Sequence, residues 1–497
     1  QSALQHGGQV LYLLPEIALT TQMVKRLKKI FGDQMGVYHS KYSNNERVEV
    51  WNSVLEETFS FVLGVRSAIF LPFNNLSLII VDEEHETSYK QFNGQPRYHA
   101  RDAALVLAQY HHAKVLLGSA TPSVETYHHA QIGKYGLVAL TERFGKATLP
   151  TIEFTNLRIE RARKSMREDF TTTLLNAITQ TLEHQEQVII FQNRRGYAPY
   201  ITCEDCAWVP MCARCAVSLT YHQRSNHLRC HYCGYYIQMP PACGVCSSHR
   251  LKNVGFGTEK LEETLQLFFP NKAIQRMDLD TTRGKHSYDQ IIEALEQGRT
   301  DILVGTQMVT KGLDFGRVSL VGVLGIDRLL HFPDFRAGER CFQLITQVSG
   351  RAGRRERQGK VIIQTMDPKH PTLEAIAQHD YVQMYERELA ERHEFLYPPF
   401  MRLIRIILKH RDQVLVAAAA QDLAQRLCEK LGKKVSGPQA PLVSRIKQQY
   451  LMELWIKVNK NPAQATAAKA WLRTAARQLL LDRTFKTVKV IFDVDPV

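Results

Sequence analysis

The sequence predicts an α/β protein with two doubly wound lobes, a cysteine-rich module inserted in the second lobe, and a small α+β domain at the C-terminal end. Three observations lead to this fold class. Short apolar runs alternate with amphipathic helical stretches, a pattern typical of parallel sheets covered by helices. Eight of the 10 cysteines lie within residues 203–246. After Tyr397-Pro398-Pro399 the pattern of elements changes, which indicates a separate domain.

The first two lobes contain eight apolar runs that we predict to be strands, in two groups separated near residues 144–150. The predicted strands are Val10–Leu14, Phe61–Val65, Leu76–Val81, Val115–Leu117, Val188–Phe191, Asp301–Val304, Leu320–Leu324 and Val361–Gln364. The C-terminal domain should contain strands 403–409, 451–458 and 487–492 and helices 417–431 and 463–480. We therefore expect lobes at 1–147 and 148–386, the cysteine-rich insertion at 201–252, and the last domain at 387–497.

The composition narrows the class of partner. Lys plus Arg (63) exceed Asp plus Glu (49), which gives a formal net charge of +14 and favours a polyanionic partner, although many basic proteins bind none. No apolar run approaches the roughly 20 residues that a membrane helix needs. The first residues do not read as a signal or transit peptide. The sequence therefore predicts a cytoplasmic protein without a membrane partner.

The cysteines form four Cys-x-x-Cys pairs, each of which directs two thiolates at one point, so that two pairs complete a tetrahedral zinc site. Four pairs therefore predict two Zn²⁺, whereas disulfides are the alternative reading that a reducing compartment disfavours. Only five residues separate the first two pairs, which is too short for them to face each other. A nested and a crossed pairing both stay open. Cys341 and Cys428 are isolated, and we expect them to be ordinary buried thiols.

An acidic sequence, Asp82-Glu83-Glu84-His85, ends the predicted strand Leu76–Val81. Parallel sheets bind ligands at the carboxyl ends of their strands. There Asp82 could hold Mg²⁺ through water, and Glu83 could orient and deprotonate a water that attacks a γ-phosphate. Taken alone, such a strand end is more often a solvated turn.

Three further polar segments follow predicted strands and strengthen the interpretation of this edge as a nucleotide-binding site. They are Gly118–Thr121, Gly305–Asp314 and Gln347–Arg354. The last one places Arg351 and Arg354 three residues apart, which we read as one helical face matched to phosphate charge. A basic solvated helix is the alternative. Gly350 and Gly353 argue against it because glycine is a poor helix former.

With these segments in place the chain resembles superfamily 2 helicases and, among them, the PriA (primosomal protein N′) family of replication-restart helicases. The resemblance covers essentially all of the chain. Its most diagnostic stretches are Leu14–Ile17, Gly64–Ala68, Asp82–His85 with Ser88–Gln91 and Arg97–Asp102, Asn193–Tyr197, and Asp493–Pro496, together with the eight cysteines. The resemblance implies two RecA-like helicase lobes.

For the reaction, the resemblance implies an ATP-dependent, Mg²⁺-dependent 3′→5′ DNA helicase that remodels stalled or branched forks and restarts replication through primosome assembly. The catalytic residues would be Asp82, Glu83 and His85, with Arg351 and Arg354 as arginine fingers. Gln347, Gly312 and Asp314 would contact the nucleotide.

For DNA, the resemblance implies backbone contacts on both lobes and an aromatic-rich loop that senses single strands. Tyr89 and Tyr98 could stack on bases while neighbouring basic groups meet phosphates. Alternatively, these aromatics pack the loop onto the core. The implied contacts are Pro15, Glu16, Arg66, Ser67, Tyr89, Lys90, Arg97, Tyr98, Arg101, Thr310 and Lys311.

The resemblance also selects the nested zinc pairing and implies partners. One zinc would be held by Cys203, Cys206, Cys243 and Cys246, and the other by Cys212, Cys215, Cys230 and Cys233. Expected partners are single-stranded and forked DNA, single-strand-binding protein, and primosome or helicase-loading proteins. A monomeric, nucleoid-associated bacterial protein is expected.

One departure from the family pattern concerns phosphate binding. No Gly-Lys pair in the sequence is followed by Ser or Thr, so the loop GxxxxGK[ST] is absent. Because Gln1 is not a start methionine, we expect a fragment whose N-terminal region carries that loop. We predict little or no ATP hydrolysis by this chain alone. The alternative function is a non-catalytic, zinc-dependent DNA adaptor that recruits primosome proteins.

Overall fold

The computed structural model describes residues 1–15, 21–39, 42–142, 148–192, 200–214, 217–222, 226–230, 233–254, 261–277, 287–306, 316–353 and 358–497. The chain divides into two compact units, and each is described by itself. One is formed by residues 1–136 and the other by residues 137–310 and 314–496.

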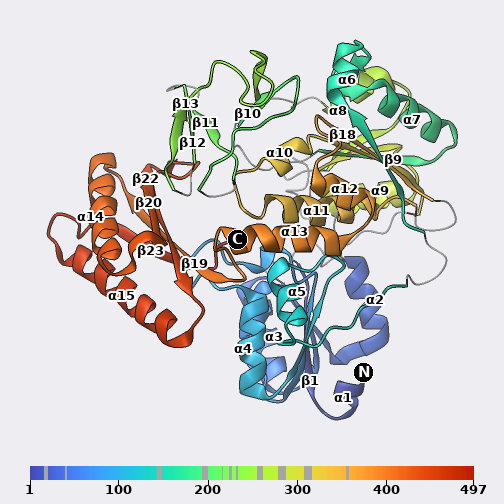
Figure 1. Ribbon diagram of the computed structural model, residues 1–497. Coiled ribbons are helices and arrows are strands. Elements are labelled where there is room, and N and C mark those ends of the chain that lie inside the picture. The colour runs from blue at the N-terminus through green and yellow to red at the C-terminus, as the bar shows by residue number, and fades with distance from the viewer. Residues whose placement is uncertain are drawn as a thin grey trace. The chain divides into compact units, whose positions relative to one another are not determined.

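The first unit contains a five-stranded, fully parallel sheet with the order β2-β3-β1-β4-β5 (Figure 1). Its strands are β1 (Gln9–Leu13), β2 (Met35–Tyr38), β3 (Phe61–Gly64), β4 (Leu76–Asp82) and β5 (Lys114–Gly118). Its helices are α1 (Ser2–Gln5), α2 (Thr21–Phe31), α3 (Asn44–Leu55), α4 (Ala100–His111) and α5 (Val124–Gln131).

Both faces of this sheet are covered, which is why its strands read as continuous apolar runs. On one face Leu11 and Ile79 pack with Val54 of α3 and Ala104 of α4. On the other face Phe61 packs with apolar side chains of α2. The polar chemistry of this unit is therefore restricted to the ends of the strands.

The second unit contains a six-stranded, fully parallel sheet with the order β15-β16-β9-β17-β18-β6. Its strands are β6 (Thr151–Asn156), β9 (Gln187–Gln192), β15 (Ile274–Met277), β16 (Ile302–Gly305), β17 (Val318–Leu324) and β18 (Lys360–Thr365), and a hairpin of β7 (Met166–Arg167) and β8 (Phe170–Thr171) precedes α7. Its helices are α6 (Leu157–Ala162), α7 (Thr172–Glu183), α8 (Leu261–Phe268), α9 (Ser287–Glu296), α10 (Asp327–Leu330), α11 (Ala337–Ser349), α12 (Pro371–Ala377) and α13 (Tyr381–Glu394).

The two parallel sheets confirm the predicted α/β class. Each of the eight predicted strands is present, with bounds that differ by no more than two residues. The sequence missed three short strands, β2, β6 and β15. They lie at or beside sheet edges, where apolar runs are short and interrupted by polar residues.

The cysteine-rich module lies between β9 and α8 (Figure 1). An antiparallel pair closes its base, β10 (Tyr200–Cys203) with β14 (Leu251–Val254). Within it lies a three-stranded antiparallel sheet of β11 (Thr220–His222), β12 (His227–Arg229) and β13 (Tyr236–Gln238).

The C-terminal domain has the order β-α-β-β-α-β, a split βαβ arrangement with an antiparallel sheet β20-β22-β19-β23. Its elements are β19 (Met401–His410), α14 (Gln413–Leu431), β20 (Val435–Gln439), β21 (Arg445–Ile446), β22 (Gln449–Asn459), α15 (Pro462–Leu481) and β23 (Lys489–Val494). Both helices pack on one face of the sheet, where Ile406, Leu454 and Leu472 are buried together (Figure 1).

Across the described part of the chain, no helix combines the length and the apolar character needed to cross a membrane.

Candidate functional site

The carboxyl edge of the first sheet gathers polar groups from three strands. Asp82 is the last residue of β4 and pairs with Gly118, the last residue of β5. The turn after β4 stays beside the end of β5, where the N–H of Glu84 donates to Gly118 O at 3.0 Å. Side chains that follow β4 and β5 are therefore brought together, as the strand order of a parallel sheet requires.

Asp82 is held from two sides. Tyr12 of β1 donates its hydroxyl hydrogen to Asp82 Oδ2 at 3.0 Å, and the N–H of Glu83 donates to Oδ1 at 3.0 Å. Burial, followed by the neighbouring Asp82 charge, raises the pKa of Tyr12 well above its ordinary range. Tyr12 therefore stays a hydrogen-bond donor that fixes the orientation of the carboxylate.

The adjacent carboxylates Glu83 and Glu84 are in opposite environments. Glu84 is fully buried, and its oxygens accept hydrogen bonds from Ser123 N (2.7 Å), Thr126 Oγ1 (2.9 Å) and Arg101 Nη1 (2.9 Å). Glu83 has a φ of 49°, a left-handed conformation, and its side chain is 37% exposed. Glu84 thus ties β4 to α5, whereas Glu83 is partly exposed, with its Oε2 buried near His85 Nδ1.

His85 connects the ends of β4 and β5. Its Nδ1 lies 2.7 Å from Ser119 Oγ and 3.7 Å from Glu83 Oε2. Ser119 Oγ also accepts a hydrogen bond from the N–H of Thr121 at 3.0 Å. The predicted coupling residue therefore lies between the acidic turn and the Gly118–Thr121 segment.

The predicted DNA-sensing loop folds back on this edge. Residues 90 and 99 form an antiparallel bridge, and Arg66 Nη1 donates to Ser88 O (2.9 Å) and Lys90 O (2.8 Å). Tyr89 is fully buried, and its hydroxyl lies 2.6 Å from Asp82 O and 3.0 Å from Leu13 O, to which it donates. The segment after β3, the loop and the acidic turn therefore form one hydrogen-bonded assembly.

Burial limits what this loop presents to a ligand in the described conformation. Tyr89 and Lys90 are both buried, and Arg101 is paired with Glu84 and Asp102. Phe92 is 44% exposed. Base stacking by Tyr89 would require the loop to open, so the DNA contacts predicted for Tyr89, Lys90 and Arg101 stay predictions that depend on such a movement.

The remaining predicted DNA contacts divide into described and undescribed residues. Pro15 is buried, whereas Ser67 and Arg97 are partly exposed. Tyr98 is partly exposed and packs edge-on against Phe70, with ring centroids 4.8 Å apart. Glu16, Thr310 and Lys311 lie outside the described residues, as do Asn193–Tyr197.

In the second unit, the predicted helical face carrying Arg351 and Arg354 is wrong. Helix α11 ends at Ser349, and the chain turns at Gly350. Gly353 then has a φ of 72°, and its N–H donates to Val318 O at 3.1 Å. The helix therefore ends before both glycines, and Arg351 lies in the turn between them.

Arg351 is mostly buried in this turn, with 9% of its surface exposed. Burial raises the pKa of Tyr288 on α9 to about 12, while the nearby Arg351 charge lowers it, which places the two side chains close together. Gln347 lies in the last part of α11 and is half-buried. Arg354, Gly312 and Asp314 are outside the described residues.

The described residues of the Cys-x-x-Cys pairs share a set of backbone hydrogen bonds. In three of them the residue after the second cysteine is left-handed, namely Ala207, Gly234 and Ser247, and its N–H donates to the carbonyl of the first cysteine. A second hydrogen bond closes all four turns, from the N–H of the first cysteine to a carbonyl five residues later. The described residues thus show one turn geometry at the first, third and fourth pairs and one of its hydrogen bonds at the second.

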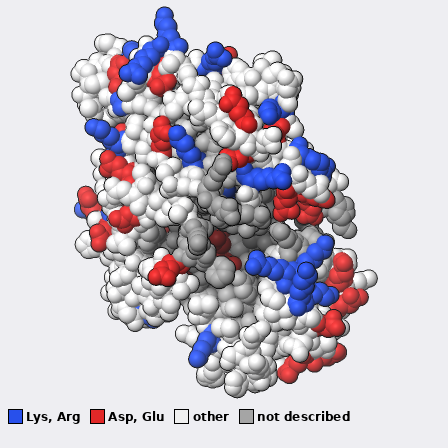
Figure 2. All heavy atoms as spheres, turned by 90° about the vertical axis from the view of Figure 1, so that its right-hand side faces the viewer, with Lys and Arg blue, Asp and Glu red and all other residues white. Residues whose placement is uncertain are grey.

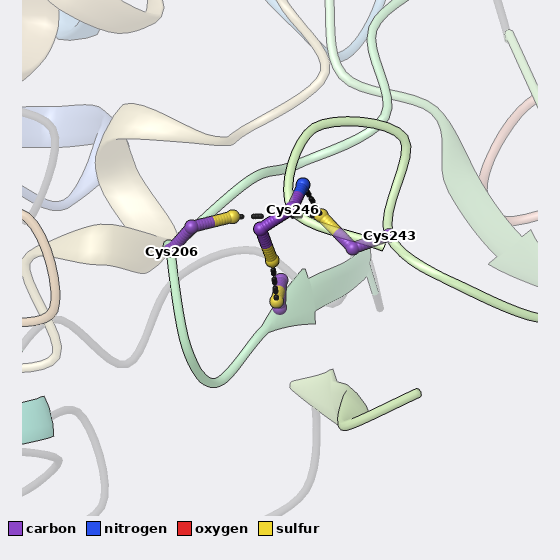
Figure 3. A group of neighbouring side chains, drawn as sticks. Cys206, Cys243 and Cys246 are labelled. Atoms are coloured by element: carbon purple, nitrogen blue, oxygen red, sulfur yellow. Dashed lines mark hydrogen bonds between the residues drawn. The ribbon is translucent and has the colours of Figure 1, made fainter. Parts of the chain in front are cut away.

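The first and last knuckles bring four sulfurs together. Cys203 Sγ lies 3.6 Å from Cys246 Sγ, and Cys206 Sγ lies 3.4 Å from Cys243 Sγ, and the labelled side chains point toward one another (Figure 3). All four sulfurs lie within 4.8 Å of one another. A tetrahedral zinc with Zn–S bonds of about 2.3 Å separates its sulfurs by about 3.8 Å. The donor set therefore fits Zn²⁺.

The second and third knuckles form another sulfur cluster. Cys212, Cys230 and Cys233 lie within 4.8 Å of one another, and Cys212 Sγ is 3.7 Å from Cys233 Sγ. Cys215 lies outside the described residues. The assignment of the eight cysteines as zinc ligands stays a prediction, and both clusters are of the thiolate kind that zinc prefers.

The two isolated cysteines differ from each other. Cys341 is buried in α11, as expected, and burial raises the pKa of its thiol above the ordinary range. Cys428 is exposed, so the expectation of a buried thiol is wrong there. It lies near the C-terminal end of α14, on the side of the helix away from the buried Leu423 and Leu427.

The module is anchored on the rest of the second unit. Ile201, Leu219 and Leu228 share an apolar cluster with Phe335 and Tyr397. Arg158 Nη1 of α6 donates to Asp205 O in the first knuckle at 2.7 Å. The module is therefore fixed against α6 and against the start of the C-terminal domain.

Comparison with known families first defines the class. A DEAD/DEAH box helicase model matches residues 1–130, and a helicase conserved C-terminal domain model matches residues 251–356. The PriA DNA helicase Cys-rich region model matches residues 212–237, and the primosomal protein N C-terminal domain model matches residues 393–497. The chain thus combines helicase-type domains with a cysteine-rich module and a C-terminal domain that both carry PriA descriptions.

Curated relatives identify the family. The chain is 41% identical over 498 residues to the replication restart protein PriA of Bacillus subtilis, covering 100% of this chain and 61% of the relative. It is 38% identical to that of Treponema pallidum, covering 100% of this chain and 74% of the relative. The chain belongs to the PriA family of replication restart proteins.

Two further comparisons set the scope of this assignment. The chain spans 61% and 55% of the lengths of the relatives from Bacillus subtilis and Synechocystis. Among solved structures, RecG bound to a three-way DNA junction has a TM-score of 0.41 at 14% identity, covering 77% of this chain and 40% of that one. A likeness at this level carries no argument about function.

Proposed function

We propose that this chain forms the motor, zinc module and C-terminal domain of an ATP-dependent, Mg²⁺-dependent 3′→5′ DNA helicase. Its role would be to remodel stalled or branched forks so that replication restarts through primosome assembly. Membership of the PriA family supports this role, and the hydrogen-bonded edge Asp82–His85 carries the chemical part of the proposal. The domain bounds predicted from the sequence are part of the proposal.

The nucleotide chemistry is assigned to the carboxyl edge of the first sheet. Asp82, oriented by Tyr12, would hold Mg²⁺ through a water. Glu83 is half-exposed and would orient the attacking water and take its proton. His85 lies between Glu83 and Ser119 and would couple nucleotide binding to the DNA-contacting segments.

The second unit is assigned the charge-neutralising groups. Arg351 and Arg354 would stabilise negative charge on the transferred phosphoryl group. Gln347, Gly312 and Asp314 would contact the nucleotide. Arg351 lies in a glycine-bounded turn, so its position depends on the C-terminal end of α11.

The DNA track is assigned to segments next to these sites. Arg66 and Ser67 follow β3. Arg66 donates hydrogen bonds to the carbonyl oxygens of Ser88 and Lys90 in the predicted DNA-sensing loop. These hydrogen bonds would couple a bound DNA strand to the acidic turn Asp82–His85. The other proposed contacts are Pro15, Glu16, Tyr89, Lys90, Arg97, Tyr98, Arg101, Thr310 and Lys311.

Two zinc sites are assigned to the cysteine-rich module. Cys203, Cys206, Cys243 and Cys246 would hold one ion, and Cys212, Cys215, Cys230 and Cys233 the other. With four protein thiolates each, the ions would stabilise the fold rather than carry a reactive water.

Phosphate binding needs a further element. Strand β5 is an edge of the first sheet, and its Leu116 is 54% exposed. Open apolar edges of parallel sheets are usually paired or covered. We propose that a strand leading into a phosphate-binding loop pairs there, and that the chain by itself hydrolyses ATP weakly or not at all.

The proposed partners follow from the family. They are single-stranded and forked DNA, single-strand-binding protein, and primosome or helicase-loading proteins. A monomeric, cytoplasmic, nucleoid-associated bacterial protein is part of the same proposal.

A second candidate function is a non-catalytic, zinc-dependent DNA adaptor that recruits primosome proteins. The observation that favours it is the absence of GxxxxGK[ST] in this sequence. The two candidates differ in whether a polypeptide that includes a phosphate-binding loop ahead of this sequence hydrolyses ATP.

The test is DNA-stimulated ATP hydrolysis by such a longer polypeptide, with Glu83→Gln as the variant. We expect hydrolysis to fall by at least a hundredfold while nucleotide affinity is retained, because only the water-activating carboxylate is lost. Glu57→Gln is the matched control, since Glu57 also has a left-handed φ of 60° but lies outside the site. Full hydrolysis by Glu83→Gln would refute the assigned role, and no hydrolysis by the unmodified polypeptide would favour the adaptor.

A further inference from the structure

The first sulfur cluster, formed by Cys203, Cys206, Cys243 and Cys246, reaches the surface of the cysteine-rich module. Cys246 is exposed and Cys206 is partly exposed. The chain around Cys246 is open as well, because residues 244–247 are all exposed and Val245 keeps 70% of its surface. A small molecule in solution can therefore reach this cluster directly.

The described members of the second sulfur cluster lie in the interior of the module. Cys212 and Cys230 are buried and belong to the apolar cluster that includes Leu219 and Leu228. Cys233 is only partly exposed and packs against the same apolar side chains. No cysteine of the first sulfur cluster belongs to this apolar cluster. The two sulfur clusters therefore differ in their access to solvent.

Two sulfur contacts of the first cluster join its two Cys-x-x-Cys pairs. Cys203 Sγ lies 3.6 Å from Cys246 Sγ, and Cys206 Sγ lies 3.4 Å from Cys243 Sγ (Figure 3). Each contact joins a buried cysteine to a more exposed one. A disulfide places its sulfurs about 2.05 Å apart, so either contact would shorten by about 1.5 Å on oxidation.

The pairing of β10 with β14 already holds the same two parts of the module together. The N–H of Glu204 also donates to Arg250 O at 2.9 Å, next to the first cluster. A disulfide between the first and last Cys-x-x-Cys pairs would therefore join segments that the backbone keeps side by side. Oxidation at this cluster is compatible with a closed module.

Charge does not distinguish the first cluster as a target for an oxidant. Arg250 binds Asp205 at 2.9 Å, and Lys252 lies 3.5 Å from Glu204, so the charges beside this cluster are balanced. Basic and acidic side chains also lie side by side on the face drawn in Figure 2. Hydrogen peroxide is uncharged, and exposure therefore decides which sulfurs it meets first.

Cys428 is the other exposed thiol among the described residues, but it differs from the first cluster. None of the sulfur contacts in the described part of the chain involves it. Oxidation of Cys428 therefore lacks a neighbouring thiol that could complete a disulfide within the molecule.

We propose that the first sulfur cluster is a peroxide-sensitive modification site, at which oxidation forms the disulfides Cys203–Cys246 and Cys206–Cys243 and releases zinc. The second cluster keeps its zinc, because its described cysteines are shielded by apolar side chains. This inference rests on the proposed function, which assigns one zinc to each cluster. It adds a difference in chemistry between the two sites.

Each disulfide consumes one molecule of hydrogen peroxide. The Cys246 thiolate attacks one peroxide oxygen, the O–O bond breaks, and a sulfenic acid forms while hydroxide leaves. The Cys203 thiolate then attacks the sulfenic sulfur, the S–S bond forms and a second hydroxide leaves. Two electrons thus pass from two sulfurs to one peroxide. A second peroxide oxidises Cys206 and Cys243 in the same way.

The test uses the full chain carrying Cys428→Ser, purified without oxygen, with its zinc content measured first. Excess hydrogen peroxide is added in the presence of 4-(2-pyridylazo)resorcinol, whose absorbance follows the released zinc. Samples are then alkylated, and mass spectrometry identifies the disulfides. Dithiothreitol and added zinc show whether the change is reversible.

We expect one zinc equivalent to be released about tenfold faster than the other, since an exposed thiolate reacts before buried ones. The disulfides Cys203–Cys246 and Cys206–Cys243 should form in this fast phase and be reversed by dithiothreitol. Release of both equivalents at one rate, no release, or disulfides that join other cysteines would overturn the inference.

Two matched variants sharpen the assignment. Cys246→His and Cys233→His each leave three thiolates and one imidazole, a ligand set that zinc accepts. Cys246→His should slow the fast phase by about tenfold because the exposed thiolate is gone, whereas Cys233→His should leave that phase unchanged. A fast phase of equal rate in Cys246→His contradicts the assignment, and the disulfide map of the unaltered cluster decides the inference independently of both variants.

The zinc content before oxidation separates this inference from the proposed function. If the purified chain holds fewer than two zinc ions, the proposed zinc assignment fails and the inference fails with it. If it holds two that are released at the same rate, only the difference between the two sites fails.

Discussion

The cysteine-rich module and the C-terminal domain lie next to each other in the second unit, yet their interiors differ. The C-terminal domain encloses an apolar core from four strands and two helices, including Ile406, Leu454 and Leu472. The module between β10 and β14 has short strands of three or four residues and buries four of its described cysteines beside a small apolar cluster that includes Ile201, Leu219 and Leu228. We therefore expect metal-bound cysteines to supplement an apolar core that so short a segment builds only in part.

A junction joins the two regions. Phe335 and Tyr397 stack with ring centroids 4.2 Å apart, and Arg392 lies over Phe335 at 5.2 Å. Arg392 is almost fully buried and pairs with Glu339 at 2.6 Å and Glu388 at 3.7 Å. Changes at this junction should therefore affect both regions, whereas changes inside either region should stay there.

The largest expected effect is the loss of a sulfur ligand. Cys230→Ser removes a buried thiol of the second cluster, and structural zinc in small domains contributes apparent free energies of about 10–16 kcal/mol. We expect one zinc equivalent to be lost and amide hydrogen exchange to speed up in residues 217–238, with the C-terminal domain still protected. Cys428→Ser, outside both clusters and exposed, is the control that should keep all zinc.

The junction should give the next largest effect. Arg392→Met leaves the buried Glu339 without its cation and leaves Glu388 with Arg387 alone, which costs about 3–5 kcal/mol. Denaturant unfolding should show this loss, and hydrogen exchange should rise in both regions at once. Adding Glu339→Met should recover part of the stability, because an apolar pair can replace a buried ion pair. A loss confined to one region would contradict the role of the junction.

A cavity in the C-terminal core tests the other side of the comparison. Leu454→Ala removes a fully buried side chain of β22 and should cost about 2–5 kcal/mol without releasing zinc. Val414→Ala, at a position 78% exposed, should change stability by less than about 0.5 kcal/mol. Zinc release by Leu454→Ala would show that the two regions do not unfold independently.

The smallest effect concerns pH at the junction. Burial raises the pKa of Glu388 from 4.5 to about 7, with Arg392 opposing and Glu339 adding to the rise. The folded state therefore binds more protons than the unfolded state between these values, so the stability contribution is complete below pH 4.5 and is lost as pH rises through about 7. Glu388→Gln should flatten the stability profile between pH 5 and 8 by about 1–3 kcal/mol, measured by denaturant unfolding. An identical slope in the variant would assign the pH dependence to other groups.

Much of the fold was predictable because fully buried parallel strands are marked by continuous apolar runs. Leu76–Val81 and Val188–Phe191 are examples, and each was found at its observed position. Strand β2 escaped prediction because Met35–Tyr38 is short and contains Gly36, which is needed since a Cβ there would lie 2.4 Å from Phe59 Cδ2. Such a requirement arises from a neighbour distant in the sequence and leaves no local pattern.

The candidate site divides in the same way. The position of Asp82 and Glu83 at a strand end could be predicted, because a polar run after an apolar strand is visible locally. The roles of Tyr12 and Glu84 could not, since their partners Asp82 and Ser123 lie far along the chain. The helical face assumed for Arg351 was wrong because α11 ends at Ser349. Glycines at 350 and 353 were visible in the sequence as poor helix formers, but we interpreted them as a sign of function.

The cysteine pairing shows where spacing alone stops being informative. The sequence left nested and crossed pairings open, and the resemblance to the PriA family favoured the nested one. The structure brings Cys203, Cys206, Cys243 and Cys246 together because β10 pairs with β14 and closes the module. Strand pairing, which depends on the whole module, therefore determines which cysteines lie together, whereas the local spacing of the cysteines does not.

Zinc content is the measurement that tests the central claim most directly, namely that zinc held by four cysteine pairs stabilises a module whose apolar cluster is small. Atomic emission on the purified chain should give two zinc ions per molecule, both released together with the fold of residues 200–254 when a strong chelator is added. A value of one or none, or a module that keeps its hydrogen-exchange protection after complete chelation, would contradict the account.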